Sequence, residues 1–157
     1  MDTFSHLDKK DMPTIVDVSA KQITRRTAVA RCIVEMPDHV VKSLQDTQFQ
    51  TKKGAVFQTA IIAGIMAAKK TGDLIPLCHP LGLENCKIDI ERSSPQQITI
   101  HCLASVSAKT GVEMEALTGA SIAALTIYDM CKALSHEIVI REIMIVEKTG
   151  GKHDYKK

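Results

Sequence analysis

The alternation of apolar and polar residues predicts four β-strands. Within Ile23–Met36 the even positions from Ala28 onward are apolar and the odd ones are mostly polar, which is typical of a strand with one buried face. The same alternation recurs over residues 86–91 and 98–102 on either side of a polar turn, so we predict a hairpin there. A last strand is predicted along residues 138–145.

Helical features occur in three segments. Pro37-Asp38 offers a helix start ahead of an apolar stripe at residues 40–44. Residues 55–71 are rich in Ala, Ile and Met and are followed by Gly72, so we predict a largely buried helix that this glycine closes. The longest helix is predicted over residues 112–134, where small side chains would let another backbone approach closely: Ala116, Gly119, Ala120, Ala123 and Ala124.

The order of these elements is strand, helix, strand, strand, helix, strand. It is typical of the α+β class and of the ferredoxin-like split β-α-β-β-α-β arrangement, an antiparallel sheet with helices packed on one face. We expect residues 1–13 to form a flexible N-terminal arm, because they are polar and end in Pro13. Residues 14–152 would then form a single ferredoxin-like domain, and residues 153–157 a C-terminal tail.

Composition narrows the classes of partner. Only 3% of the 157 residues are aromatic and the net charge is +2, so the chain offers neither stacking platforms nor a strong field for nucleic acid. No apolar run is long enough to cross a membrane. The five scattered cysteines contain no CxxC pair, which suits reduced thiols, and we expect a cytoplasmic protein.

Asp129 and Lys132 are the first candidates for chemistry. They are three residues apart on the longest predicted helix and are therefore surface neighbours. A surface ion pair would explain them, but the surrounding segment 120–133 is almost entirely apolar. A partly desolvated lysine in such a place would have a lowered pKa and could serve as an acid or base near neutrality.

Two glycine-associated lysines are candidates for binding anions. Lys53-Gly54 precedes a predicted helix, whose first backbone N–H groups could help to hold a phosphate. Gly150-Gly151-Lys152 follows the last strand and could close over a phosphate. A solvated loop lysine and a flexible turn are the alternatives at these two places.

The segment Leu77-Cys78-His79-Pro80 should form a constrained loop, since Pro76 and Pro80 exclude a regular element. Adjacent Cys and His side chains diverge, and no standard spacing supplies further zinc ligands, so we expect no metal site. A buried Cys with a His that bonds to backbone, or a loop that contacts a ligand, remain as interpretations.

Glu113 and Glu115 open the longest helix, where carboxylates complement the positive end of the helix dipole. Helical rotation places them about 200° apart, so they should not form a carboxylate pair on one face. We expect at most one of them to share a pocket with any given group.

Six segments form a recognisable set in this order between residues 16 and 152: Val16–Lys21, Ile62–Lys69, Leu74–Leu81 (LIPLCHPL), Lys109–Thr118 (KTGVEMEALT), Ala124–Ala133 (ALTIYDMCKA) and Gly150–Lys152. The set resembles the cyclic pyranopterin monophosphate synthases of molybdenum cofactor biosynthesis. That resemblance implies conversion of (8S)-3′,8-cyclo-7,8-dihydroguanosine 5′-triphosphate to cyclic pyranopterin monophosphate plus pyrophosphate. It also implies a ferredoxin-like subunit in a homohexamer, a trimer of dimers.

The resemblance also implies roles for individual residues. Asp129 matches the family's active-site aspartate, and Lys53 and Lys132 match its catalytic lysines. The other matching positions, which contact substrate or belong to the same pocket, are Leu77, Cys78, His79, Met114, Glu115, Arg26, Glu113, Lys148 and Lys152. No cofactor is required for such acid-base chemistry, although Mg²⁺ could accompany the triphosphate.

The chain departs from the family pattern at a few positions. Ala55 follows Lys53-Gly54 where a polar residue is usual, and the tail continues as His153-Asp154-Tyr155 where Ser-Gly is expected. The second departure leaves the role of the C-terminal glycine loop open. Cys32, in place of a small or polar residue, changes nothing in this interpretation.

Helix length adds a geometric hypothesis. Glu115 and Asp129 are 14 residues apart on one predicted helix, which is about 21 Å along its axis and too far for one small-molecule pocket. If both serve one site, that site must use two subunits. We hypothesise that antiparallel copies of the helix pack across a two-fold axis through their Ala and Gly faces.

Two alternative functions remain for the chain. One is a zinc-dependent GTP hydrolase using Cys78 and His79, and the other is a non-catalytic nucleotide-sensing module.

Overall fold

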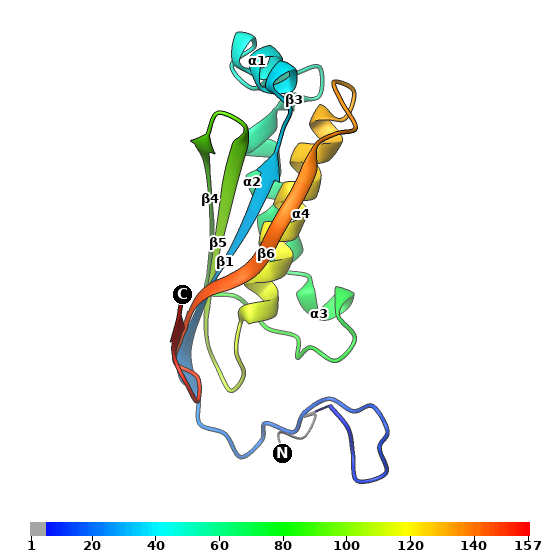
Figure 1. Ribbon diagram of the computed structural model, residues 1–157. Helices are drawn as coiled ribbons and strands as arrows, with labels where there is room; N and C mark the ends of the chain where they lie inside the picture. Colours follow the sequence, from blue (N-terminus) through cyan, green and yellow to red (C-terminus); the bar gives the residue numbers. More distant parts are fainter. Residues whose placement is uncertain (1–5) are drawn as a thin grey trace.

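A five-stranded antiparallel sheet forms one layer of the molecule (Figure 1). The structure is a computed structural model that describes residues 6–157; the first five residues of the predicted N-terminal arm lie outside the described part. The strand order β4-β5-β1-β6-β7 contains the predicted ferredoxin-like arrangement in its first four strands. The strands are β1 (Thr24–Glu35), β4 (Asn85–Ser94), β5 (Gln97–Ala108), β6 (Val139–Thr149) and β7 (Tyr155–Lys156).

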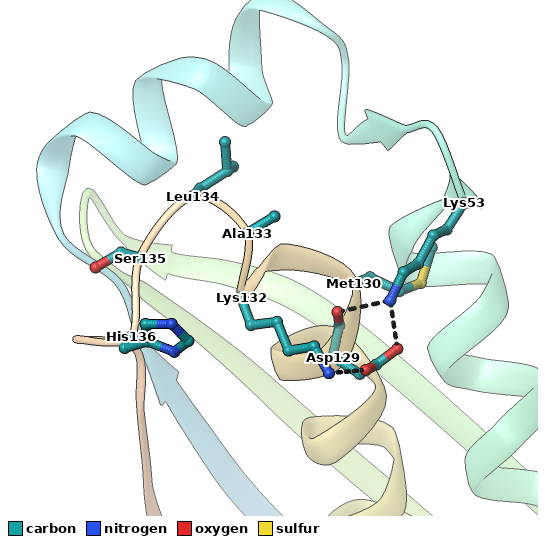
Figure 2. A pocket seen from close by; sticks show the side chains of 8 residues that line it. All are labelled: Lys53, Asp129, Met130, Lys132, Ala133, Leu134, Ser135 and His136. Atoms are coloured by element: carbon teal, nitrogen blue, oxygen red, sulfur yellow. Dashed lines mark hydrogen bonds and ion pairs between the residues drawn. The ribbon is translucent and has the colours of Figure 1, made fainter.

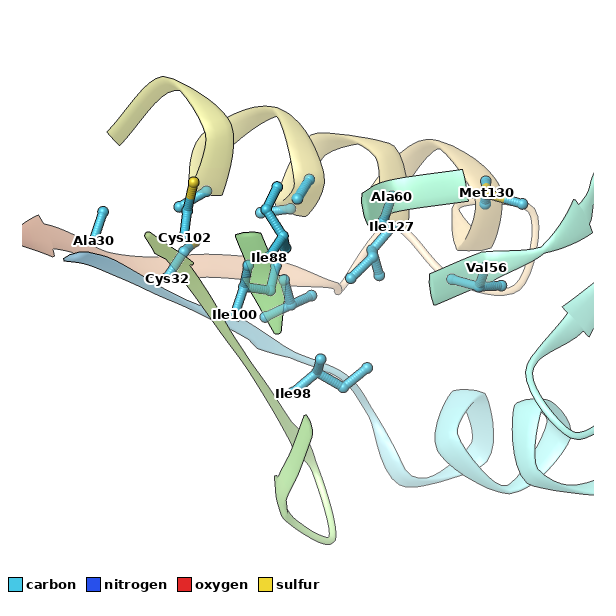
Figure 3. Packing of buried hydrophobic residues seen from close by; sticks show 14 of the residues in the cluster. Ala30, Cys32, Val56, Ala60, Ile88, Ile98, Ile100, Cys102, Ile127 and Met130 are labelled. Carbon is cyan, nitrogen blue, oxygen red and sulfur yellow. The ribbon is translucent and has the colours of Figure 1, made fainter. Parts of the chain in front are cut away.

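Helices cover one face of this sheet, as the sequence predicts (Figure 1). Alternate residues of β1 from Ala28 to Val34 are fully buried beneath them, which confirms the predicted strand and its buried face. Ile100 of β5 and Ile127 of α4 meet in the same core (Figure 3). The helices are α1 (Asp38–Asp46), α2 (Val56–Ala68), α3 (Thr71–Leu74) and α4 (Glu113–Cys131).

Two glycines allow α2, α4 and the sheet to approach one another closely. A Cβ atom on Gly64 of α2 would lie 2.7 Å from the carbonyl oxygen of Gly119 and 2.3 Å from Cδ1 of Ile88. A Cβ atom on Gly119 of α4 would lie 2.6 Å from Sγ of Cys102. The backbones therefore pack at distances that only glycine permits.

The small-residue face of α4 is consequently occupied within the chain. Ala116, Ala120, Ala123 and Ala124 are all fully buried. The close approach predicted for this face is confirmed, but its partner is α2 and the sheet. The hypothesis that two copies of α4 pack through their Ala and Gly faces is therefore wrong, because these faces are already covered within one chain and the α4 helix of a second copy cannot reach them.

We predict that Gly64→Ala lowers the free energy of unfolding by about 1–3 kcal/mol, because the added methyl group must displace backbone or core atoms. Gly82→Ala is the matched control, since a Cβ atom there would meet nothing within 4 Å. Urea unfolding of the two variants checks the prediction. Equal stability of Gly64→Ala and wild type would show that the helices can separate freely.

The helix predicted over residues 55–71 differs from expectation in two respects. It ends at Ala68, and Gly72 lies inside the short helix α3. It is also only half covered, with Ile62 60% and Met66 53% exposed. The reason is that α2 contacts the core through a single i, i+4 stripe: Val56, Ala60, Gly64 and Ala68.

Three very short strands were not predicted. β2 (Gln50–Thr51) pairs with β3 (Gly54–Ala55) between α1 and α2, and β7, which lies in the predicted tail, pairs with β6. Strands of two residues carry no alternation that a sequence pattern could reveal.

In the described part of the chain, no helix has the length and apolarity needed to span a membrane.

Candidate active site

Lys53, Asp129 and Lys132 form a hydrogen-bonded cluster, which we call the Asp129 site (Figure 2). Nζ of Lys53 donates to Oδ2 of Asp129 at 2.8 Å and to its backbone carbonyl oxygen at 3.1 Å. Nζ of Lys132 lies 2.7 Å from Oδ1 of the same carboxylate. The three residues that the sequence nominates as catalytic are therefore in direct contact.

Two separate elements bring these side chains together. Asp129 lies in the last turn of α4, and Lys132 caps that helix. Lys53 lies in the turn between β2 and β3, 76 residues away from Asp129 along the chain. Gly54, with φ +110°, completes that turn in a conformation that other residues rarely adopt.

The charges of the Asp129 site stabilise one another. Hydrogen bonds from Lys132 and then Lys53 lower the pKa of Asp129 to about 2. The hydrogen bond to Asp129 in turn raises the pKa of Lys132 above its ordinary value. Asp129 therefore stays a carboxylate, and Lys132 an ammonium group, throughout the neutral range.

The lowered pKa predicted for Lys132 is wrong for this chain. The side chain is 49% exposed and lies next to a carboxylate. The apolar neighbours that suggested desolvation, such as Ile127 and Cys131, point into the core instead. Attraction by the carboxylate is then the dominant effect on the pKa.

A hollow of about 540 Å³ adjoins the Asp129 site. Beyond the three charged residues it is lined by Met130, Ala133, Leu134, Ser135 and His136. Figure 2 shows the imidazole of His136 on the Lys132 side of this hollow. Ser135 and His136 were not predicted, and their only signal in the sequence is their position just after Lys132.

A second group of predicted residues lines a separate hollow of about 260 Å³, which we call the Glu115 site. It lies between the loop before β4 and the first turn of α4. The predicted residues in its lining are Leu77, Cys78, His79, Glu113, Met114 and Glu115, and the lining residues that sequence reasoning missed are His6, Leu81, Thr110 and Gly111.

Glu115 is the buried acid of this site. It is only 3% exposed, and burial, with a smaller contribution from Glu113, raises its pKa above the ordinary value. Glu113 lines the same hollow, so the prediction that only one of the two shares a pocket is wrong. The hollow surrounds the end of α4, where residues on different helix faces can both border it.

The Cys78 and His79 side chains do not form a metal or nucleophile pair. Nε2 of His79 lies 2.8 Å from the carbonyl oxygen of Val16 and so donates its proton there. Burial and the nearby Glu115 raise the pKa of Cys78, which keeps it a thiol. Within residues 6–157 no three His, Cys, Asp or Glu side chains are grouped to hold a metal ion, so the zinc hydrolase interpretation lacks a ligand set.

Of the basic residues nominated by the sequence, Lys148 contacts the Glu115 site, and Arg26 and Lys152 lie at the glycine turn that follows β6. Nζ of Lys148 forms an ion pair with Glu113 at 3.0 Å. Nε of Arg26 donates to the carbonyl oxygen of Ala108 at 3.1 Å, and a Cβ atom on Gly151 would lie 3.5 Å from Nη1 of Arg26. Lys152 is exposed in the same glycine turn. These cations could hold phosphate groups next to the buried acid.

The predicted residues thus form two sites at opposite ends of α4, which Figure 1 shows running along the sheet. Glu115 and Asp129 are 14 residues apart, which is about 21 Å of helix, as the sequence predicts. One chain does not bring the two sites together.

Comparison with known proteins gives a consistent match. The model of the MoaC family matches residues 15–151. A "Cyclic pyranopterin monophosphate synthase" of Xanthomonas oryzae is 49% identical over 150 residues, which covers 96% of this chain and 91% of that protein. A protein of the same name from Lysinibacillus sphaericus is 49% identical, with 97% and 96% covered.

Longer relatives also match. A "Molybdenum cofactor biosynthesis bifunctional protein" of Synechocystis is 51% identical over 155 residues, and the match covers 96% of this chain. The chain spans 45% of the length of that protein. It spans 26% of the "Molybdenum cofactor biosynthesis protein 1" of Dictyostelium discoideum, to which it is 48% identical.

Proposed function

The chain belongs to the MoaC family, and on that basis we propose that it is a cyclic pyranopterin monophosphate synthase of molybdenum cofactor biosynthesis. The reaction converts the 3′,8-cyclised dihydro-GTP to cyclic pyranopterin monophosphate and pyrophosphate. The observation that carries the proposal is the Asp129 site: the two lysines and the aspartate that the resemblance marks as catalytic are hydrogen-bonded at 2.7–2.8 Å.

The charge state of the Asp129 site suggests how these residues divide the work. Asp129, with a pKa of about 2, holds and orients the lysines and is not itself a proton donor. Lys132 is an ammonium group that can donate a proton to a ring nitrogen or oxygen and neutralise developing negative charge. Arg26, Lys148 and Lys152 would hold the triphosphate, from which pyrophosphate leaves.

Glu115 supplies a carboxyl group that could act alongside the ammonium group of Lys132. Its raised pKa makes its carboxyl group easier to protonate than an exposed glutamate. A buried acid of this kind can hydrogen-bond a polar heterocycle and exchange a proton with it. It can do so in the same reaction as Lys132 only if the Asp129 site and the Glu115 site meet.

We propose that they meet between subunits of a homohexamer, a trimer of dimers. The distance along α4 supports this, because the two sites cannot share a small molecule within one chain. The exposed apolar side chains on the outer side of the helix layer supply a surface for a second copy: Ile62, Met66 and Leu125 are each more than half exposed. This surface replaces the small-residue face of α4 in our earlier hypothesis.

The proposed reaction needs no cofactor. It moves protons, opens and closes rings and forms a cyclic phosphate, without a net change in oxidation state; Mg²⁺ could accompany the triphosphate. A cytoplasmic location fits the five cysteines, which are all free thiols.

The decisive experiment supplies purified protein with the cyclised dihydro-GTP. We expect pyrophosphate to be released and, after oxidation, a fluorescent pterin to form in equal amount. A folded protein that binds this compound without forming either product would instead be the nucleotide-sensing module. Turnover that requires stoichiometric zinc would support the hydrolase.

A further inference from the structure

The hairpin that carries Lys53 is too small to fix its own position. Its strands β2 and β3 contain two residues each, and such a short pair is marginal in water. Internally the turn is well bonded: Oγ1 of Thr51 accepts from the backbone N–H of Lys53 at 3.1 Å and donates to the carbonyl oxygen of Gly54 at 3.3 Å. The hairpin can therefore move as one unit, and its attachment decides where Lys53 lies.

That attachment passes through Phe49. Its backbone N–H donates to the carbonyl oxygen of Leu44 in α1 at 2.6 Å. Its carbonyl oxygen accepts from the N–H of Val56, the first residue of α2, at 3.0 Å. Phe49 thus joins the end of one helix to the start of the next, directly at the base of the hairpin.

The backbone at this junction is strained. Gln48 and Phe49 have φ values of +52° and +57°, a left-handed conformation that residues with a Cβ atom rarely adopt, and least often in succession. Such a conformation persists only where surrounding contacts hold it. Neither residue is a glycine or asparagine, which would relieve the cost.

An aromatic stack supplies the contact. The rings of Phe49 and Phe57 lie with centroids 4.6 Å apart and an interplanar angle of 29°. The chain has three Phe residues and no Trp, and two of its few aromatic rings lie at this one junction. Phe57 lies in the first turn of α2, and it therefore anchors the strained segment to a regular element.

We propose that Phe49 is a positioning residue for the proposed reaction: its ring, stacked on Phe57, holds the left-handed junction in place and thereby sets Lys53 on Asp129. The consequence is the contact between Lys53 and Asp129, which are 76 residues apart along the chain: Nζ of Lys53 reaches Oδ2 of Asp129 at 2.8 Å. The inference about turnover rests on the proposed function, whereas the inference about the placement of Lys53 does not.

The test compares Phe49→Leu, which removes the ring, with Phe49→Tyr, which keeps it. We expect Phe49→Leu to lower kcat by about 10- to 100-fold with little change in KM, because a displaced catalytic group costs about this much. Phe49→Tyr should restore kcat to within about threefold of wild type. A ring that served only general stability would not separate kcat from KM in this way.

A second readout follows Lys53 without any substrate. Brief acetylation with acetic anhydride, read by mass spectrometry, compares Lys53 with its exposed neighbour Lys52 in the same peptide region. In wild type, Lys53 should react more slowly than Lys52, because it donates to Asp129. In Phe49→Leu its rate should rise to that of Lys52, while Lys132, which keeps its own bond to Asp129, reacts as before.

The proposal would be overturned if Lys53 in Phe49→Leu were acetylated at the wild-type rate. It would also be overturned if Phe49→Tyr lost as much kcat as Phe49→Leu does. If Phe49→Leu does not fold, Phe57→Leu removes the same stack from the α2 side, and the same two outcomes decide. If wild type fails to turn over the substrate, the proposed function fails, but the labelling still decides whether Phe49 positions Lys53.

Discussion

Asp129→Asn is expected to lower kcat by about 10³-fold while leaving the protein folded. The carboxylate accepts hydrogen bonds from Lys132 and Lys53 through different oxygens, at 2.7 and 2.8 Å. An amide offers one acceptor oxygen, and its NH₂ group would face a lysine that can only donate. One lysine must then leave its place. Pyrophosphate release over a range of substrate concentrations measures kcat and KM separately.

Asp89→Asn is the matched control for this substitution. Asp89 also pairs with a lysine, Lys87, at 2.8 Å, but on the edge strand β4, away from both sites. It should leave kcat unchanged. A kcat for Asp129→Asn within about threefold of wild type would show that Asp129 does not take part in the proposed reaction.

The pH dependence follows from the same cluster. The pKa of Asp129 is depressed to about 2. The carboxylate therefore holds the two lysines fully above the ordinary aspartate pKa near 4, and it is lost only as the pH falls toward 2. An acidic limb of the activity profile between pH 5 and 7 therefore reports another group. In Asp129→Asn the pKa of Lys132 should fall, because Asp129 is what raises it. The alkaline limb of the residual activity should then move to lower pH.

The fold could be predicted from the sequence because its main elements are long. From Ala28 onward the residues of β1 alternate regularly enough to show their buried face, and α4, with 19 residues, is unambiguous by length. The hairpin of β2 and β3 could not be predicted, since two residues show no period. Its position depends on the junction at Phe49, and a left-handed backbone at a phenylalanine has no signature in sequence.

The three charged residues of the Asp129 site were predictable, whereas other lining residues, such as Ser135 and His136, and the electrostatics of the site were not. The nominated lysines and Asp129 do meet. The direction of the pKa shift at Lys132 could not be predicted from the sequence. It depends on which way the apolar neighbours point and on the contact between Asp129 and the ammonium group. The same holds for α4, whose small-residue face could have met another subunit but packs against α2 and the sheet.

A mixture of two inactive variants should recover activity if the proposed site lies between subunits. Glu115→Ala damages the Glu115 site and Asp129→Asn damages the Asp129 site, and each variant alone should be nearly inactive. When both are co-expressed in equal amounts, half of the Asp129 sites and half of the Glu115 sites are intact. Random pairing across subunits then leaves about a quarter of the composite sites complete. Pyrophosphate release per subunit should therefore rise from near zero to about a quarter of the wild-type rate.

A second pair of variants separates complementation from nonspecific recovery. Asp129→Asn and Lys132→Ala both damage the Asp129 site, whose members lie 2.7 Å apart on one chain. No pairing of these subunits can assemble a complete Asp129 site, so their mixture should stay inactive. Activity in the first mixture and none in the second would place Glu115 and Asp129 of one reaction on different chains. Inactivity of both mixtures, in hybrids isolated through a different tag on each variant, would contradict the shared site, because the 21 Å of helix between the two residues would then separate unrelated functions.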